Sequence, residues 1–383
     1  MSNHNRINQG YLHSIFFLFL VALQASIPAP AAGQWSETII DPEMAGDDKA
    51  LVDIDGDGYL DIVAGGKRAE NEPLTWYHYP DWQRYIIAFP DEEFTTEMDT
   101  GDMDGDGDMD LVVCDGPNGI NCRYYVNPRP GGDPRQQTAW TSRDIGSGGT
   151  WVHDLRVADY NRDGRPDVLT NRGLFTQNSN GSFIKSSPSG NCFGDVDGDN
   201  DLDIIAPGQW YENPGWIPHT APGGGGNEEK VRIADLNRDG KNDIILNSGD
   251  GTGDLAWYSS TNPKNGIWDK HLIQAGVVGG HSLSIGDIDR DGDHDILSAE
   301  MFPEVAVYLN NGNGSFIKQT ISTAGAHNAV LGDIDKDGDL DIMGCNYTGN
   351  PPLRLWRNQP AVGPIPGPGT PIICPSIMLL LGQ

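Results

Sequence analysis

An acidic motif of nine residues recurs seven times along the chain and constrains the fold more than any other feature. Each copy matches D-x-[DN]-x-D-[GN]-x-x-D and is followed by two aliphatic residues or by Ile and Met. Successive copies begin 36 to 57 residues apart, a spacing that suits one four-stranded blade for each repeat. The sequence therefore predicts an all-β fold, a seven-bladed β-propeller of four-stranded antiparallel blades. The copies begin at Asp53, Asp102, Asp159, Asp195, Asp235, Asp287 and Asp333.

The residue types of the motif indicate a calcium site. Oxygen atoms at positions 1, 3 and 5 converge where the chain turns sharply, and position 6 is Gly or, once, Asn200. These two residue types best tolerate a positive φ. Position 7 can offer its main-chain carbonyl, and position 9 adds a last carboxylate. Hard oxygen ligands without His or Cys favour Ca²⁺ over zinc or copper, so the predicted cofactor is Ca²⁺, with up to seven ions.

An EF-hand, a dockerin or plain acidic turns fit the motif less well. An EF-hand needs Glu at position 12 between two helices, but position 12 is Ala64 in the first copy and Val113 in the second. A dockerin has two copies on helices, whereas this chain has seven copies with strand-like flanks. Solvated Asp-rich turns do not account for seven copies at blade-like spacing.

The predicted calcium ligands occupy positions 1, 3, 5, 7 and 9 of each copy. In the first three copies they are Asp53, Asp55, Asp57, Tyr59, Asp61, Asp102, Asp104, Asp106, Asp108, Asp110, Asp159, Asn161, Asp163, Arg165 and Asp167. In the last four they are Asp195, Asp197, Asp199, Asp201, Asp203, Asp235, Asn237, Asp239, Lys241, Asp243, Asp287, Asp289, Asp291, Asp293, Asp295, Asp333, Asp335, Asp337, Asp339 and Asp341.

The seven sites are predicted to differ in affinity. Asn161 and Asn237 each replace one carboxylate, so the loops that begin at Asp159 and Asp235 are expected to bind calcium most weakly. The chain has 25 Lys and Arg against 55 Asp and Glu, a formal net charge of −30. Seven Ca²⁺ ions would add 14 positive charges to this −30 and leave −16. An acidic chain repels nucleic acid and anionic membrane surfaces, so neither is expected as a partner.

Aromatic residues mark the second half of each repeat. A strand with aromatics such as Trp76-Tyr77 follows the motif, and an alternating strand led by Trp or Phe ends the repeat, as in WDKHLI from Trp268. These aromatics are predicted to pack between blades rather than to stack on a ligand. The seventh repeat lacks its last strand, and WSETII from Trp35 matches the missing segment. We expect this N-terminal strand to complete the seventh blade and close the ring.

The two ends of the chain differ in composition from the predicted propeller, residues 34–358. Residues 1–31 contain an apolar run and small residues at 29–31, the pattern of a signal peptide. The chain is therefore predicted to be secreted, to the extracellular space, the periplasm or the cell surface. Residues 359–383 form a proline-rich tail whose apolar end is too short for a stable transmembrane segment. The chain is expected to be a monomer.

Export also permits disulfide formation between cysteines. Cys114 and Cys122 flank a predicted turn, where facing positions of a hairpin can be linked. A disulfide and two separate thiols both remain open for this pair. Cys192 and Cys345 are expected to be core thiols, and Cys374 lies in the tail.

The calcium motif and Phe193-Gly194 before its fourth copy resemble the FG-GAP/VCBS repeat family, the propeller type of integrin α-subunit heads and of many bacterial secreted proteins. The resemblance covers about residues 35–358. It implies a Ca²⁺ ion between the first two strands of each blade, held by the residues named above. It implies less about function, because such propellers serve adhesion, scaffolding and some carbohydrate-active enzymes.

Three histidines suggest a second site. His153, His281 and His327 each lie six residues before the first Asp of their motif, and Glu229 has the same position in the fifth repeat. These positions lie where the innermost strand begins, at the end of the channel opposite the calcium loops. Each histidine could cap its strand, or together they could line a mouth that binds a ligand or supplies acid/base groups. Blades six and seven are neighbours, so His281 and His327 could share a metal or a substrate, with His153 facing them.

These features are compatible with functions of different classes. The first is a binding or adhesion module whose mouth and loops hold a glycan or protein ligand. The alternative is a carbohydrate-active enzyme that uses the histidines, because similar placements occur in propellers that resemble polysaccharide lyases and sugar dehydratases. A third possibility is a scaffold alone. Convergence of His153, His281 and His327 on a shared cavity would keep the enzyme hypothesis open, and wide separation around an empty hole would remove its basis.

Overall fold

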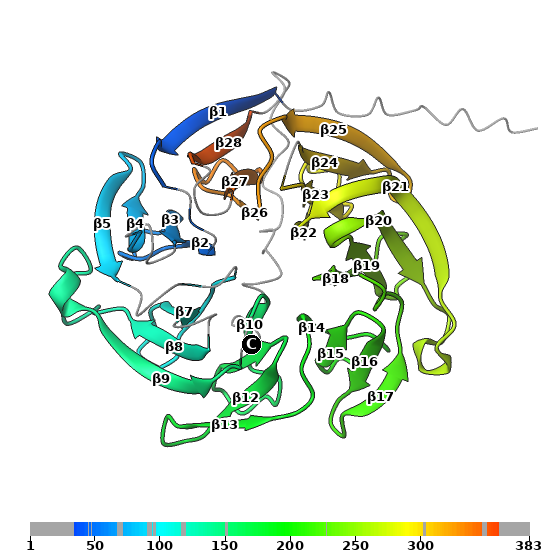
Figure 1. Cartoon of the computed structure of the whole chain (residues 1–383), viewed down its shortest axis with the longest axis horizontal. Coiled ribbons are helices and arrows are strands. Elements are labelled where there is room, and N and C mark those ends of the chain that lie inside the picture. The colour runs from blue at the N-terminus through cyan, green and yellow to red at the C-terminus, as the bar shows by residue number, and fades with distance from the viewer. Residues whose placement is uncertain are drawn as a thin grey trace, which may run out of the picture. The chain divides into compact units, whose positions relative to one another are not determined.

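The computed structural model describes residues 34–359 apart from 45, 47, 67–71, 90–93, 95–96, 116–119, 150–151, 227, 302–303 and 347–350. All described residues belong to one unit, Ala32–Gln383. In this unit seven sheets of four antiparallel strands surround a central channel (Figure 1). The prediction of a seven-bladed β-propeller is therefore confirmed. The predicted signal peptide and the tail from residue 360 onward, which includes Cys374, lie outside the described residues.

Each blade is a sheet whose strands follow one another from the channel outward. The first four blades contain β2 (Asp48–Val52), β3 (Asp61–Gly65), β4 (Leu74–His78) and β5 (Gln83–Ala88); β6 (Asp99–Gly101), β7 (Asp110–Asp115), β8 (Asn121–Val126) and β9 (Thr141–Ser147); β10 (Leu155–Ala158), β11 (Asp167–Thr170), β12 (Gly173–Gln177) and β13 (Phe183–Ser186); and β14 (Cys192–Gly194), β15 (Asp203–Ala206), β16 (Gln209–Glu212) and β17 (Ile217–Thr220). The last three contain β18 (Lys230–Ala234), β19 (Asp243–Asn247), β20 (Gly249–Ser259) and β21 (Asp269–Gly280); β22 (Ser282–Gly286), β23 (Asp295–Ala299), β24 (Val305–Asn310) and β25 (Phe316–Ser322); and β26 (Asn328–Gly332), β27 (Asp341–Cys345), β28 (Leu353–Gln359) and β1 (Gln34–Asp41).

Helical structure among the described residues is limited to two short 3-10 turns. These are η3 (Gln137–Ala139) and η4 (Pro263–Asn265), which lie between the third and fourth strands of their blades. Within the described part of the chain, no helix has the length and hydrophobicity needed to cross a membrane.

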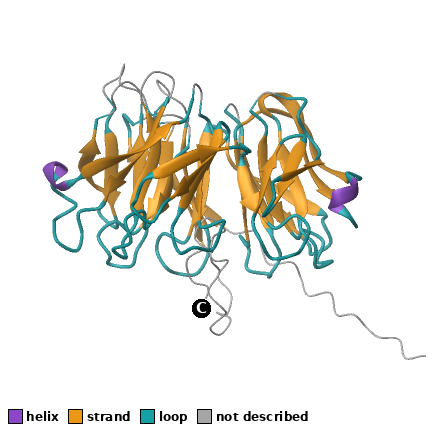
Figure 2. Ribbon diagram, turned by 90° about the horizontal axis from the view of Figure 1, so that it is seen from below, coloured by secondary structure: helices purple, strands orange, loops and turns teal. Residues whose placement is uncertain are grey.

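The second strand of each blade lies deepest in the core, which follows from its sequence. It begins with the last Asp of the motif and continues with mainly apolar residues, and every residue of β19 and β27 is buried. Apolar side chains on both faces allow such a strand to pack between two neighbouring blades. The outermost strands are more exposed, as β25 is. The strands run between two layers of connecting loops, one at each end of the channel (Figure 2).

The N-terminal strand closes the ring as predicted. β1 pairs with β28 in antiparallel register, with Trp35 opposite Asn358 and Glu37 opposite Trp356 (Figure 1). The indole Nε1 of Trp356 also donates a hydrogen bond of 3.0 Å to Glu37 Oε2. The strand from the start of the propeller therefore completes the blade formed by its end, and the edge of β28 is covered.

The aromatic residues of the third strands pack between blades, as predicted. Trp76, Trp210 and Trp356 are among the largest fully buried side chains. Trp76 belongs to a cluster with Leu111 of the second blade, and Trp356 belongs to a cluster with Leu297 of the sixth blade. Because each large ring fills the space between two sheets, these residues set the spacing of the blades.

Four outermost strands begin one residue after the Trp that leads the predicted segment, at Gln83, Thr141, Ile217 and Asp269. Trp82 and Trp216 have positive φ angles of 56° and 53°, a conformation that a strand ladder does not accommodate. The chain therefore turns at these residues, and the strands start at Gln83 and Ile217.

The disulfide between Cys114 and Cys122 is formed, which settles the alternative that the sequence left open. The two cysteines face each other on β7 and β8. Both are buried, and so are Cys192 and Cys345, which were expected to lie in the core.

Loss of this disulfide is expected to lower the stability of the propeller. The bond closes a loop with a sequence separation of 8 residues, and the loop-closure entropy of such a loop corresponds to about 2.5 kcal/mol. Reductant should therefore lower the melting temperature of the wild-type chain by several degrees, as measured by calorimetry. The variant C114A/C122A should melt at the lower temperature with or without reductant, and C192A should keep the response. An unchanged wild-type melting temperature in reductant would contradict this expectation.

Candidate functional site

Polar side chains gather at both ends of the channel. In every blade the acidic motif joins the first strand to the second, for example between β2 and β3. The histidines lie just before the first strand, as His281 does before β22. Since a motif and a histidine flank opposite ends of the same strand, the loops and the histidines mark opposite ends of the channel. The location predicted for both groups is therefore correct.

The motif loops share one hydrogen-bond pattern. In all seven copies the N–H of position 6 donates to the carboxylate of position 1, as Gly58 does to Asp53 Oδ2 at 2.8 Å. The N–H of position 7 donates in turn to the carboxylate of position 5. Every position 6 has a positive φ, including Asn200 at 70°, which explains why Gly or Asn stands there.

The Asp at position 9 ties the loop to the rest of its blade. Asp110 accepts hydrogen bonds from the N–H of Met103, in its own loop, and from the N–H of Asn127, just after β8. Asp61 does the same with Ile54 and Tyr79. Burial therefore does not leave these carboxylates without donors, and the loop geometry is fixed by the blade itself.

The donor set of the loops fits a calcium ion. Atoms of Asp53, Asp55 and Asp61 lie within 4.8 Å of one another, and equivalent atoms of the second loop do so too. Among the described residues, no hydrogen-bond donor reaches the buried oxygens Asp287 Oδ1 and Asp333 Oδ1. Buried carboxylate oxygens need a donor or a cation. When bound, Ca²⁺ would supply positive charge to these oxygens.

Basic residues at position 4 of the motif connect neighbouring loops, a feature that the repeat pattern did not predict. Arg162, Arg238, Arg290 and Lys336 occupy this position, each with a positive φ. Arg238 forms an ion pair with Asp293 of the next blade. The guanidinium of Arg290 lies 3.5 Å from an oxygen of Asp337 in the seventh loop. Arg162 donates a hydrogen bond to the main-chain carbonyl of Asn200 in the fourth loop. The ammonium group of Lys336 lies over the ring of Tyr59 in the first loop. These four cations therefore link consecutive loops around the ring.

An Asn at the end of the third strand provides a second link that was not predicted from the sequence. Asn127 Nδ2 donates to the carbonyl of Ile54 in the preceding blade at 2.9 Å. Asn213, Asn310 and Asn358 make the same kind of contact. The sequence signal is an Asn two or three residues after the aromatic of that strand, as in Trp356-Arg357-Asn358.

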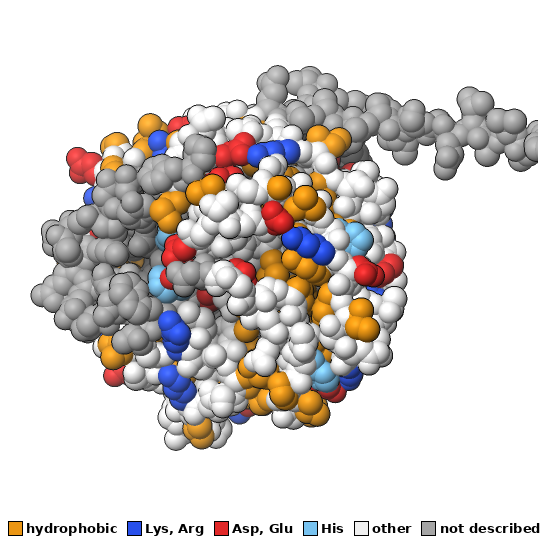
Figure 3. Space-filling view, turned by 45° about the vertical axis from the view of Figure 1, so that its right-hand side comes forward, with side chains coloured by type: hydrophobic (Ala, Val, Ile, Leu, Met, Phe, Trp, Pro, Cys, Tyr) orange, Lys and Arg blue, Asp and Glu red, His pale blue; other side chains and the backbone are white. Residues whose placement is uncertain are grey.

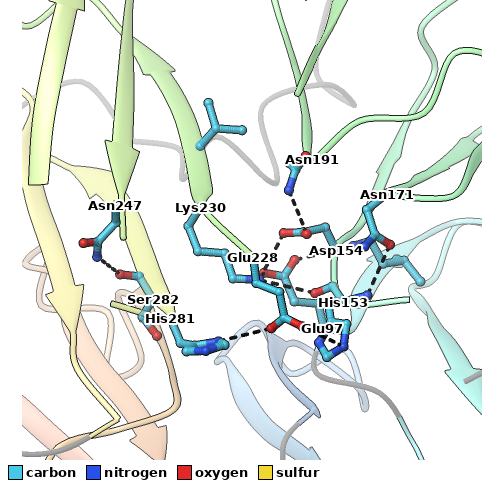
Figure 4. A network of polar contacts seen from close by, with 12 residues as sticks. Glu97, His153, Asp154, Asn171, Asn191, Glu228, Lys230, Asn247, His281 and Ser282 are labelled. Carbon is cyan, nitrogen blue, oxygen red and sulfur yellow. Dashed lines mark hydrogen bonds and ion pairs between the residues drawn. The ribbon is translucent and has the colours of Figure 1, made fainter. Parts of the chain in front are cut away.

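The three predicted histidines converge at the other end of the channel. The rings of His281 and His327 are stacked with their centroids 4.3 Å apart. Glu228 lies between His281 and His153, with its Oε1 3.1 Å from His153 Nε2 and its Oε2 4.0 Å from His281 Nδ1 (Figure 4). His281 Nε2 also contacts Asp250 Oδ1. The Glu228 carboxylate therefore lies between His153 on one side of the channel and the stacked pair His281 and His327 on the other.

Glu229, the predicted acidic candidate, lies outside this group. Its carboxylate accepts hydrogen bonds of 2.7 and 2.8 Å from the N–H groups of Gly224 and Gly226 in its own loop. Its neighbour Glu228 faces the histidines instead, with a positive φ of 58°. A non-Gly residue adopts this conformation at a cost in conformational energy. Residues in such conformations cluster at functional sites.

Burial shifts the groups at this mouth toward their neutral forms. It lowers the pKa of His153 to about 4 and also lowers the pKa of His281 and of His327. Burial, together with the charge of Asp250, raises the pKa of Glu228 to about 7. At neutral pH the imidazoles therefore carry no charge.

A buried ionic network lies beside the histidines. Lys230 Nζ is 3.1 Å from Asp154 Oδ1 and 3.4 Å from Glu97 Oε1, and Arg156 forms an ion pair with Glu97. Asn191 donates to the other oxygen of Asp154 at 2.8 Å (Figure 4). Burial opposes ionisation of Glu97, but the charges of Arg156 and Lys230 outweigh it and lower the pKa of this carboxyl to about 2. The network joins the second, third, fourth and fifth blades across the channel.

A cavity of about 370 Å³ runs along the channel beside these groups. Its wall includes Arg156, Arg232 and His281, and much of the remainder is aliphatic, for example Leu283 and Leu331. A cavity of this size and mixed lining is typical of small-ligand sites. On the face shown in Figure 3, acidic, basic and histidine side chains are interspersed among uncharged ones.

Comparisons with known proteins agree with this architecture. The sequence profile of FG-GAP-like repeats matches residues 53–113, 102–170, 235–298 and 287–344, together more than half of the chain. No curated protein matches the chain significantly. A solved structure of a lectin from Agrocybe aegerita, described as recognising non-reducing terminal N-acetylglucosamine, is similar with a TM-score of 0.51 and 19% identity, over 78% of this chain and 90% of the lectin chain. BBS1N in complex with ARL6DN is similar with a TM-score of 0.55 and 10% identity, over 86% of this chain and 98% of that chain. At these identities the likeness shows the fold.

Proposed function

The chain belongs to the FG-GAP-like repeat family, and from this premise we propose that it is an exported, calcium-stabilised binding module. Its ligand is a glycan, and its binding site is the end of the channel where His153, Glu228 and His281 meet. Calcium in the motif loops serves stability rather than ligand binding, because the loops lie at the opposite end of the first strands.

The observation that carries this proposal is that three polar side chains from different blades lie around Glu228, which itself precedes β18. They are His153, His281 and Asp250. Glu228 and His153 remain partly exposed, with 19% and 14% of their side chains accessible, whereas His281 is buried at 2%. Partly exposed carboxylate and imidazole groups can bind sugar hydroxyls, which both donate and accept hydrogen bonds, and His281 also lines the channel cavity. The lectin that shares the fold binds a terminal amino sugar, which supports a glycan over other ligands.

We expect the variant E228Q to bind such a glycan about 10- to 100-fold more weakly, because an amide replaces a carboxyl group that sugar hydroxyls would bind. A glycan array that includes terminal N-acetylglucosamine identifies the ligand, and calorimetry then gives the affinities. The control is H219Q, which removes a histidine paired with Glu212 at 2.8 Å on the outer strands of blade four. Equal binding by E228Q and the wild type would place the glycan elsewhere, and no bound glycan would favour a protein ligand.

A carbohydrate lyase or dehydratase is the second candidate, since the histidines do converge. Glu228 or a neutral imidazole could take a proton from the carbon next to a carboxylate or carbonyl, and a second group at 3 to 4 Å could give a proton to the departing oxygen. Such an elimination needs no added reactant. An assay for unsaturated sugar products, with E228Q as the inactive variant, separates this function from binding alone.

A further inference from the structure

The histidine mouth contains a ligand set that differs in kind from the motif loops. The loops offer oxygen atoms, whereas the mouth combines the carboxylate of Glu228 with ring nitrogens of His153 and His281. Glu228, Asp250 and His281 have ligand atoms within 4.8 Å of one another. Imidazole nitrogens favour transition-metal ions over calcium.

We propose that Glu228, His153 and His281 bind one divalent transition-metal ion, with Asp250 as the residue that orients His281. This inference goes beyond glycan binding and does not depend on it. The site would hold two nitrogen ligands and one carboxylate, a set that zinc and iron(II) sites use with further positions open to water or substrate.

The distances at Glu228 suit this assignment. Its two carboxylate oxygens lie 3.1 Å from His153 Nε2 and 4.0 Å from His281 Nδ1. Ligand atoms bound at about 2.0–2.2 Å from one ion lie roughly 3–4 Å apart. In the close-up the Glu228 carboxylate lies between the two rings, so an ion bound beside this carboxylate would have a ring on either side of it (Figure 4).

The surroundings fix the imidazole of His281. Asp250 Oδ1 contacts Nε2 of this ring, so the proton lies on Nε2 and the lone pair of Nδ1 faces Glu228. The stacked ring of His327 holds the plane of His281 from one side. A carboxylate that bonds the far nitrogen of a histidine ligand is the usual second partner in metal sites and commonly contributes 10- to 100-fold to affinity.

The site is accessible, and the backbone places its main carboxylate. Glu228 and His153 are partly exposed, so an ion can enter from the end of the channel. Glu228 has a positive φ in a connection with several glycines, and this conformation places its side chain between the third and sixth blades.

Titration of the full chain with Co²⁺ in an excess of Ca²⁺ tests the proposal. Calcium fills the oxygen sites, and Co²⁺ bound by imidazole gives visible absorption bands. We expect one Co²⁺ per chain, displaced by Zn²⁺. E228Q should abolish the bands, and H153Q tests the same point if E228Q does not fold. D250N should lower the affinity for Co²⁺ about 10- to 100-fold.

The matched control is H78Q. His78 Nε2 lies 3.2 Å from Asp55 Oδ2 of the first motif loop, and His78, Asp55 and Asp57 form another cluster that could hold an ion. H78Q should keep the bands. The proposal would be overturned if the wild type did not bind Co²⁺. It would also be overturned if H78Q lost the bands while folded E228Q kept them. Metal binding is measured without any glycan, so its failure is distinguishable from failure of the proposed function.

Discussion

Removal of calcium is expected to lower the melting temperature of the propeller by more than about 10 °C. A site that binds only the folded chain contributes about 2.7 kcal/mol when the free ion is at 100 times its dissociation constant. Four loops with Asp at all of positions 1, 3, 5 and 9 and Gly at position 6 would then contribute about 11 kcal/mol together. Each kcal/mol corresponds to about 2–4 °C for a domain of 150–250 residues, so even partial filling gives a large shift.

The physical cause of this loss is repulsion within the loops. Each loop holds three to five carboxylates that the hydrogen bonds of the blade keep together. Without the ion these charges repel one another, and buried oxygens such as Asp287 Oδ1 lose a cation partner. The basic residues at position 4 offset part of this repulsion, as Arg238 does at Asp293.

Scanning calorimetry with EGTA, and again after Ca²⁺ is restored, measures the effect. The variant D289N gives the sixth loop the Asn that the third and fifth loops already have, so its calcium affinity should fall. D144N, which removes an exposed carboxylate of β9, is the control and should behave as the wild type. An unchanged melting curve in EGTA would refute the calcium proposal.

The fold and the loops could be predicted from the sequence because their determinants are local. The motif fixes its own turn through contacts within nine residues, such as that from Gly58 to Asp53. The aliphatic residues after position 9 predict the buried strand, and WSETII predicts the closing strand because it matches its counterparts in other blades. Repetition then makes a weak local signal strong.

The mouth could be predicted only in part, because its residues come from irregular connections. The histidines were found from their fixed offset to the motif. Glu228 and Asp250 have no such offset. Glu228 lies in a glycine-rich connection, and Asp250 lies at the start of β20, which extends farther than other third strands and pairs with β21 up to Gly280. Which of two adjacent glutamates faces the channel depends on the φ of Glu228, which the sequence pattern does not specify.

Replacement of Lys230 by Met is expected to destabilise the propeller by about 3–5 kcal/mol. Lys230 is 2% exposed, and its Nζ lies 3.1 Å from Asp154 Oδ1 and 3.4 Å from Glu97 Oε1. Met fills a similar volume, so the cost comes from two buried carboxylates that lose a shared cation. Arg156 still neutralises part of the charge on Glu97, whereas Asp154 keeps the hydrogen bond from the neutral amide of Asn191.

Denaturant unfolding of K230M and of K230M/D154N separates charge from packing. If uncompensated charge causes the loss, the double variant should recover a large part of the stability, because the amide introduced by D154N carries no charge and can still accept a hydrogen bond from Asn191. The control K270M breaks an exposed pair with Asp254, 2.7 Å long, and should cost less than about 1 kcal/mol. Equal losses in K230M and K270M would show that the buried network does not hold the blades together. A large loss confined to K230M would instead identify this network as the polar link across the channel, which fixes the separation of the blades that carry His153 and Glu228.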